Sequence, residues 1–147
     1  MYRINEGLID IPDDWQDRSV NVIGSTITGA GVTMTITRDE IPMGMPFAEY
    51  VQGQARQARD ALDGFVSAGP RDLLIDGRSA IEIECRWNAK QGRVHQIITT
   101  VQYGHRALVL TASVAGEMSD ARLTEMRRII SSLQFEENNS NGMAQQG

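Results

Sequence analysis

The chain has 147 residues and a formal net charge of −5, with 14 Lys and Arg against 19 Asp and Glu. This length suits one domain with a single core, and the acidic balance argues against a nucleic-acid partner or an anionic membrane. Cys85 is the only cysteine, so no internal disulfide is possible and a reducing compartment fits.

No targeting or membrane segment is visible. The N-terminus lacks a basic segment followed by an apolar run, and no apolar stretch approaches the ~18 residues of a membrane span. We therefore expect a soluble cytoplasmic domain that does not insert stably into a membrane.

Short strands are predicted in the first third of the chain. Residues 2–11 contain one or two of them, and Arg18 to Ile23 forms the next, with Val20 and Val22 on one face. Val32 to Arg38 alternates three apolar residues with three threonines, which is the two-residue period of a strand.

The segment from Pro46 to Gly64 is predicted to be an amphipathic helix. Pro46 suits its first position, and Gly64 suits the left-handed residue that commonly ends a helix. Its apolar stripe is mostly alanine, which lets another backbone approach closely. The stripe therefore either packs tightly on its own sheet or receives a partner. Its members are Ala48, Val51, Ala55, Ala58 and Leu62.

Three long strands follow, at Arg78 to Asn88, Arg93 to Tyr103 and Arg106 to Ala115, joined by short turns. They are predicted to form an antiparallel meander. Ser119 then caps a second helix at Asp120 to Ser132. We expect residues 1–137 to form one domain and residues 138–147 to be a disordered polar tail.

The faces of these strands differ in character. In the first long strand, apolar residues oppose Glu82, Glu84 and Arg86, a pattern that predicts one covered face and one wet face. The other two carry apolar, threonine or serine residues on both faces. Either both faces are buried within the monomer or, since only two helices are available to cover the sheet, one face is held for a partner.

Residues suited to catalysis are sparse. His95 and His105 are the only histidines, and neither has another ligand at metal-binding spacing. Glu82 and Glu84 alternate with apolar residues as a solvated strand face does, and Cys85 has the pattern of a small core residue. No glycine-rich phosphate loop or nucleophile elbow occurs. We expect no enzyme activity, no metal and no cofactor, with a small-ligand site at His95 or Glu82 as the remaining alternative.

The sequence resembles the DcrB-like domain family and, more closely, the Eag chaperones of type VI secretion effectors. The resemblance covers most of residues 2–135, in YRINEGLIDIPDDWQDRSVNV, TITRD, PFAEYV, LDGF and IDGRSAIEIE. It implies an α+β fold of the Mog1/PsbP group, an antiparallel β-sheet flanked by helices, assembled as a cupped homodimer.

The resemblance also implies a function. Eag chaperones bind the N-terminal transmembrane helices of PAAR-containing effectors, often of the Rhs type, and shield them before loading onto the VgrG spike. Thr35 replaces the aliphatic residue expected at its position, and its hydroxyl can hydrogen-bond a bound helix. An alternative is a DcrB-like structural or envelope-associated domain without an effector client. The implied groove residues are Val20, Val22, Thr35, Ala55, Ala58 and Leu62.

Overall fold

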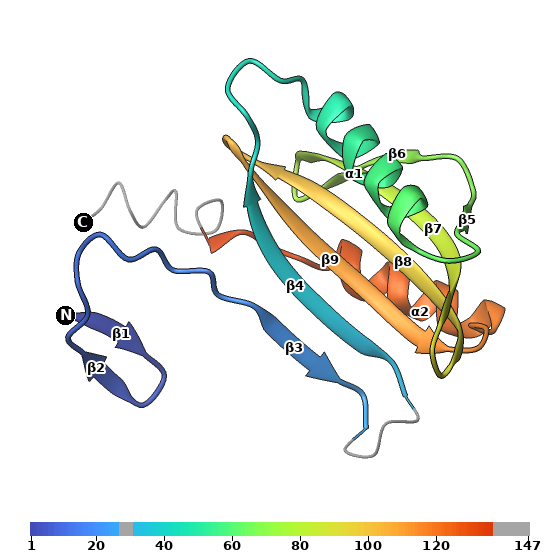
Figure 1. The fold of residues 1–147 in the computed structure, drawn as a ribbon, viewed down its shortest axis with the longest axis horizontal. Coiled ribbons are helices and arrows are strands. Elements are labelled where there is room, and N and C mark those ends of the chain that lie inside the picture. The colour runs from blue at the N-terminus through green and yellow to red at the C-terminus, as the bar shows by residue number, and fades with distance from the viewer. Residues whose placement is uncertain (27–30, 137–147) are drawn as a thin grey trace.

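The computed structural model describes residues 1–26 and 31–136 (Figure 1). Within these ranges it contains nine strands and two helices. The strands are β1 (Tyr2–Ile4), β2 (Gly7–Ile9), β3 (Asn21–Gly24), β4 (Thr33–Glu40), β5 (Val66–Ser67), β6 (Arg71–Ile75), β7 (Arg78–Ala89), β8 (Gly92–Tyr103) and β9 (Arg106–Ala115). The helices are α1 (Phe47–Ala61) and α2 (Asp120–Ser131).

Seven of the strands form one antiparallel sheet, in the order β3-β4-β9-β8-β7-β5, with β6 also paired to β7. The predicted meander is confirmed as β7, β8 and β9, and the predicted α+β class is confirmed with it. Strands β1 and β2 form a separate hairpin that lies apart from this sheet (Figure 1).

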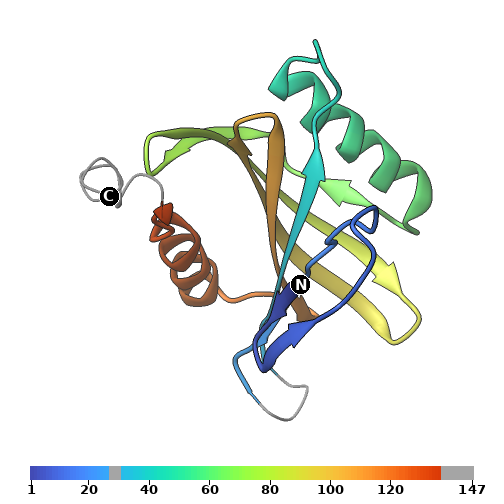
Figure 2. The same ribbon diagram turned by 90° about the vertical axis from the view of Figure 1, so that its left-hand side faces the viewer.

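The two helices lie on opposite sides of the sheet (Figure 2). The larger apolar core lies under α2, and smaller apolar clusters lie under α1. The most deeply buried residues of the larger core are Ile75, Ala80, Ile97, Val101, Ala112 and Ile130.

Helix α2 begins where the sequence predicts. The backbone N–H of Arg122 donates to the Ser119 hydroxyl at 3.1 Å, which satisfies one of the free N–H groups of the first turn. Met126 and Ile130 are buried against the sheet, as their spacing indicates. The helix ends at Ser131, one residue before the predicted end.

Helix α1 differs from its prediction at both ends and in its buried stripe. Pro46 is the extended N-cap, and Gly64 adopts a left-handed φ of 62° but lies beyond the helix end at Ala61. Ala48, the first member of the predicted apolar stripe, is exposed at the helix start and does not pack on the core. Val51 is buried, as the stripe predicts, and Tyr50, which the stripe does not include, is buried as well.

The prediction of a wet face on β7 is also wrong. Glu82 points toward α2 and is only 4% exposed. The alternating pattern misleads here because α2 covers that face with a complementary charge, Arg127, rather than with apolar side chains alone. The predicted polar tail, residues 138–147, lies outside the described residues, so that prediction stays untested.

Strand β3 is shorter than the predicted Arg18 to Ile23. The guanidinium of Arg38 donates to the Ser19 carbonyl at 3.4 Å and to the Asn21 side chain at 2.6 Å. These side-chain bonds take the place of backbone pairing before Asn21, so the regular strand begins there.

Candidate functional site

One side of the sheet is partly uncovered. Helix α1 lies over β7 and β8, and no helix in the described residues lies over β9, β4 and β3 on the same side (Figure 1). We call this uncovered surface the open face. Cross-strand pairing joins Val22 to Thr35, Thr35 to Thr111 and Thr111 to Ile98, so these side chains form one row across it.

The open face is almost free of charge. Within the described parts of β3, β4, β9 and β8, Asp39 is the only charged residue that points to this side. The remainder is apolar or carries a hydroxyl or amide group. The hydroxyl and amide residues are Thr33, Thr35, Thr37, Thr111, Ser113, Gln96, Thr100 and Gln102.

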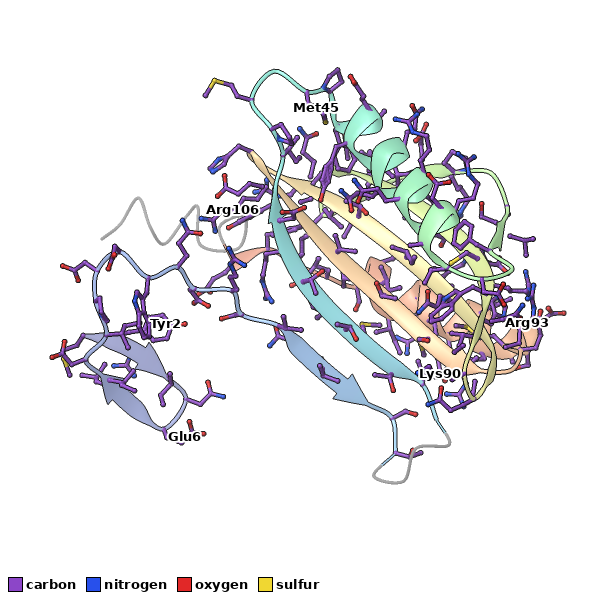
Figure 3. The ribbon with its side chains drawn as sticks, viewed as in Figure 1. Tyr2, Glu6, Met45, Lys90, Arg93 and Arg106 are labelled. Atoms are coloured by element: carbon purple, nitrogen blue, oxygen red, sulfur yellow. The ribbon has the colours of Figure 1, made fainter. Side chains whose placement is uncertain are left out.

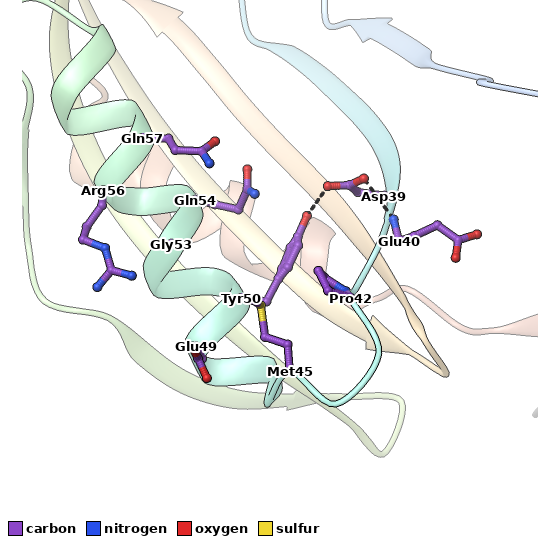
Figure 4. A pocket seen from close by; sticks show the side chains of 10 residues that line it. All are labelled: Asp39, Glu40, Pro42, Met45, Glu49, Tyr50, Gly53, Gln54, Arg56 and Gln57. Atoms are coloured by element: carbon purple, nitrogen blue, oxygen red, sulfur yellow. Dashed lines mark hydrogen bonds between the residues drawn. The ribbon is translucent and has the colours of Figure 1, made fainter.

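Helix α1 forms a wall along the open face. Tyr50, Gln54 and Gln57 point toward β4, whereas Arg56 points away from it (Figure 4). Residues spaced by three and four share one side of a helix, so Ala61 continues this uncharged row. The sequence analysis missed the row, although its signal is present as an uncharged spacing in a helix that also carries Arg56 and Arg59.

The two ends of the open face differ because acidic residues gather at only one of them. Met45 and Arg106 lie at one end of the long strands, and Lys90 and Arg93 lie at the other (Figure 3). At the first end a pocket of about 250 Å³ lies between α1 and the end of β4. Its lining includes three acidic residues, Asp39, Glu40 and Glu49, and one basic residue, Arg56.

Tyr50 links α1 to β4 at that end. Its hydroxyl donates to the Asp39 carboxylate at 2.6 Å (Figure 4). Burial of the ring raises the pKa of Tyr50 well above its usual value, and the Asp39 carboxylate raises it further. The phenol therefore stays protonated and remains a donor across the whole physiological pH range.

The structure separates the six groove residues implied by resemblance. Val22, 68% exposed, and Thr35 are direct cross-strand partners on the open face, and Val20 immediately precedes β3. Ala55 instead points from α1 toward the sheet. It packs there with Val51 in the cluster that contains Ile81, Ile83 and Cys85. Ala58 and Leu62 are half-buried on the side of α1 that faces the sheet.

The opposite face carries the charged residues. Glu82 accepts hydrogen bonds from Arg71 at 2.9 Å and from Arg127 of α2 at 3.1 Å. Burial acts to raise the pKa of Glu82, but the hydrogen bonds and charges of the two arginines outweigh it and lower that pKa. This network holds α2 on the sheet, which is a structural role.

His95 belongs to the same network and is fully buried. Its Nδ1 accepts the Met118 backbone N–H at 2.8 Å, so Nδ1 carries no proton. Nε2 then carries the proton and donates to Glu84 at 2.9 Å. Both ring nitrogens are occupied by the protein itself. On the other face of the sheet, burial raises the pKa of the Cys85 thiol to about 11. Neither residue is arranged for nucleophilic chemistry.

The described residues contain no group of three or more His, Cys, Asp or Glu side chains placed to hold a metal ion. Residues 1–26 and 31–136 also contain no helix that is both long and apolar enough for a membrane span.

Residues 6–132 match the DcrB family. The chain belongs to the DcrB family. A Pseudomonas aeruginosa PAO1 protein, effector EagT6, is 34% identical to it over 95 residues. That alignment covers 63% of this chain and 65% of the relative.

Solved structures show the same fold for this DcrB-family chain. The P. aeruginosa protein PA94, whose function is unknown, has a TM-score of 0.72 at 24% identity, covering 92% of this chain and 95% of its own. LpqN, involved in cell envelope biogenesis of Mycobacterium tuberculosis, has 0.57 at 13% identity, over 82% and 77%.

A cyanobacterial PsbP from Synechocystis sp. PCC 6803 has a TM-score of 0.54 at 11% identity, over 77% of this chain and 79% of its own. The predicted PsbP-like fold is therefore confirmed. At such low identities these three likenesses show the fold alone. None of the four relatives is named as an enzyme.

Proposed function

We propose that the chain is a chaperone of a type VI secretion effector. It holds the N-terminal transmembrane helices of a PAAR-containing, Rhs-type effector on the open face until that effector is loaded onto the VgrG spike. The observation that carries the proposal is the open face itself, an almost uncharged sheet surface that no helix of the described residues covers. The 34% identity to effector EagT6 supports the link to this secretion system.

The chemistry of the open face suits an apolar helix. Membrane helices pack through small residues and through hydroxyl or amide hydrogen bonds, and the face offers Ala115, Thr35 and Thr111 in these roles. Each 100 Å² of apolar surface removed from water contributes roughly 2.5 kcal/mol before the costs of ordering are subtracted. A carboxylate or ammonium group in the middle of the face would oppose this binding, and none points there in the described strands.

The length of the face supports a homodimer. Strand β4 has 8 residues, and a strand of that length spans roughly 26 Å. A helix of about 20 residues that crosses a membrane is roughly 30 Å long. One chain aligned with the strands therefore leaves part of such a helix uncovered, and a second copy completes the cup.

The N-terminal arm supplies a surface for that second copy. Ile4, Leu8, Ile9 and Trp15 are all exposed, between 43% and 65%, on a segment that includes the separate hairpin (Figure 1). Exposed apolar residues clustered in this way favour an interface. The chaperone acts in the cytoplasm, before export of its client, where its single cysteine stays reduced.

Co-purification tests the proposal. The tagged chain is co-expressed with a PAAR-containing effector from the same genome, either complete or without its N-terminal apolar segments. We expect the complete effector to co-purify and the shortened effector to be lost. Equal recovery of both forms would contradict the proposal and would favour a structural or envelope-associated DcrB-like domain without a client.

Substitutions on α1 locate the contact. Ala58→Gln and Leu62→Gln place bulky amides beside the open face, and we expect each to reduce effector recovery at least tenfold. Ala48→Gln is the matched control, because Ala48 is exposed on the opposite flank of the same helix. Size-exclusion chromatography with light scattering checks that all three variants keep the dimer of the wild type.

A further inference from the structure

Burial changes sharply along β9 on the open face. Ala107 is completely buried, Val109, Thr111 and Ser113 are half-buried, and Ala115 is exposed. All five point to the same side of the sheet, because alternate residues of a strand share a face. The open face is therefore covered at its Ala107 end and uncovered along the rest of its length.

The ring of Tyr50 covers the open face at the Ala107 end. Tyr50 packs with Ala107 and Ile41 in one buried cluster, and its hydroxyl bonds Asp39. Asp39 is the cross-strand partner of Ala107, so the ring passes from α1 across β9 and reaches β4 (Figure 4). The small side chain of Ala107 makes this passage possible.

The chemistry of the surface changes at the same place. On one side of the ring, the cross-strand rows of the open face that contain Thr37, Thr35 and Thr33 have no charged side chain. At the ring itself, Asp39, Glu40 and Glu49 contribute to the pocket between α1 and β4. Asp39 accepts from Tyr50 and Glu40 lies 3.7 Å from Arg106, but covering these charged groups with apolar groups would still cost desolvation energy. An apolar segment therefore gains by lying on the uncharged side and by ending at the ring.

We propose that Tyr50 is a specificity-determining residue that sets one end of the apolar segment held on the open face. This inference rests on the chaperone function proposed above, and the occupant is the N-terminal apolar segment of the effector. Its last apolar turn lies against the Tyr50 ring. Its polar flank, which in membrane-spanning segments is often Lys or Arg, lies at the acidic pocket.

The length of β4 between Thr33 and the Tyr50 ring also sets how long an apolar segment one chain can cover. From Thr33 to Asp39 the strand rises roughly 20 Å, which corresponds to about 13 residues of α-helix. Each chain therefore shields about 13 apolar residues, counted from the Tyr50 ring.

Photocrosslinking of the purified complex tests this register. A photoreactive amino acid is placed at Val22, on the open face, or at Met45, at the acidic pocket, and the crosslinked effector residues are identified by mass spectrometry. We expect crosslinks from Val22 within the apolar segment and crosslinks from Met45 only in its polar flank. Crosslinks from Met45 into the middle of the apolar segment would overturn the inference.

Two variants separate the ring from its hydroxyl. Tyr50→Leu keeps an apolar contact with Ile41 but cannot reach β4, and we expect its Met45 crosslinks to move about one turn into the apolar segment. Tyr50→Phe keeps the ring, and we expect no movement. Unchanged positions in Tyr50→Leu would overturn the inference while the complex itself still forms. Absence of any complex with the wild-type chain would instead remove the proposed function and this inference together.

Discussion

The two faces of the central sheet differ in charge and in how completely they are covered. The face under α2 is closed and combines the main apolar core with Glu82, Glu84 and His95. The open face is almost uncharged, and no helix among residues 1–26 and 31–136 lies over β3, β4 and β9 on that side. An antiparallel sheet normally buries its apolar face and exposes its charged one. The charge on the closed face helps to dock α2, through the bonds from Arg127 to Glu82 and Glu84, and we propose that the open face binds a partner.

The largest difference between the faces is expected in stability. Ile130→Ala removes a side chain that is 3% exposed beneath α2, and we expect the free energy of unfolding to fall by about 3 kcal/mol. Val22→Ala shortens a side chain that is 68% exposed on the open face, and we expect a change within about 0.5 kcal/mol. Urea denaturation measures both, and equal losses would remove the distinction between the faces.

Removing the charge that docks α2 is the next largest effect. Arg127→Ala takes two donor nitrogens from Glu82 and leaves that buried carboxylate with Arg71. We expect a loss of about 2 kcal/mol in the free energy of unfolding, because hydrogen bonds to a charged group are among the stronger ones. Arg128→Ala, on the exposed side of α2, is the control and should leave stability nearly unchanged.

The bond between Tyr50 and Asp39 is expected to be worth less. Tyr50→Phe removes the hydroxyl but keeps the buried ring, and Asp39 is exposed enough for water to replace the donor. We expect the free energy of unfolding to fall by about 1 kcal/mol in urea denaturation. A loss above about 3 kcal/mol would show that this end of α1 depends on the bond rather than on the ring.

A smaller effect is expected from acid. The folded state lowers the pKa of Glu82, so the unfolded chain takes up the proton first as the pH falls. The stability from Glu82 is complete above its unfolded pKa, about 4.3, and is lost as the pH falls through the lower folded pKa. Unfolding measured from pH 5 to pH 3 should therefore be steeper for the wild type than for Glu82→Gln. Parallel curves would contradict this role of Glu82.

Much of the fold was predictable because it depends on local patterns. The two-residue alternation in β7, β8 and β9 defines three strands, and the short turns between them leave an antiparallel meander as the natural arrangement. Ser119 marks the start of α2 for an equally local reason, since its hydroxyl accepts a backbone N–H of the first turn.

Which side chains of α1 and α2 cover each face of the sheet could not be predicted from such local patterns. Glu82 is buried by Arg127, which lies 45 residues further along the chain, and the pattern of β7 alone contains no trace of that contact. Ala107 is covered by Tyr50 from another element. These contacts depend on where α1 and α2 dock, which periodicity within one strand does not specify.

The candidate site shows the same division. Resemblance led to Val22 and Thr35, and pairing of β3 with β4 places them side by side. It also led to Ala55, which packs under α1 instead. Gln54 and Gln57 were missed because glutamines on a helix are usually solvated, and only the position of α1 beside the open face makes them part of its wall.

The most direct measurement is the affinity of two charge variants for the effector's N-terminal apolar segment. Thr35→Asp places a carboxylate on the open face, and Thr124→Asp places the same group on an exposed position of α2. We expect Thr35→Asp to weaken binding at least tenfold while Thr124→Asp binds like the wild type, with both proteins folded by circular dichroism. Unchanged binding by Thr35→Asp, or equal losses in both variants, would contradict the assignment of the open face as the binding surface.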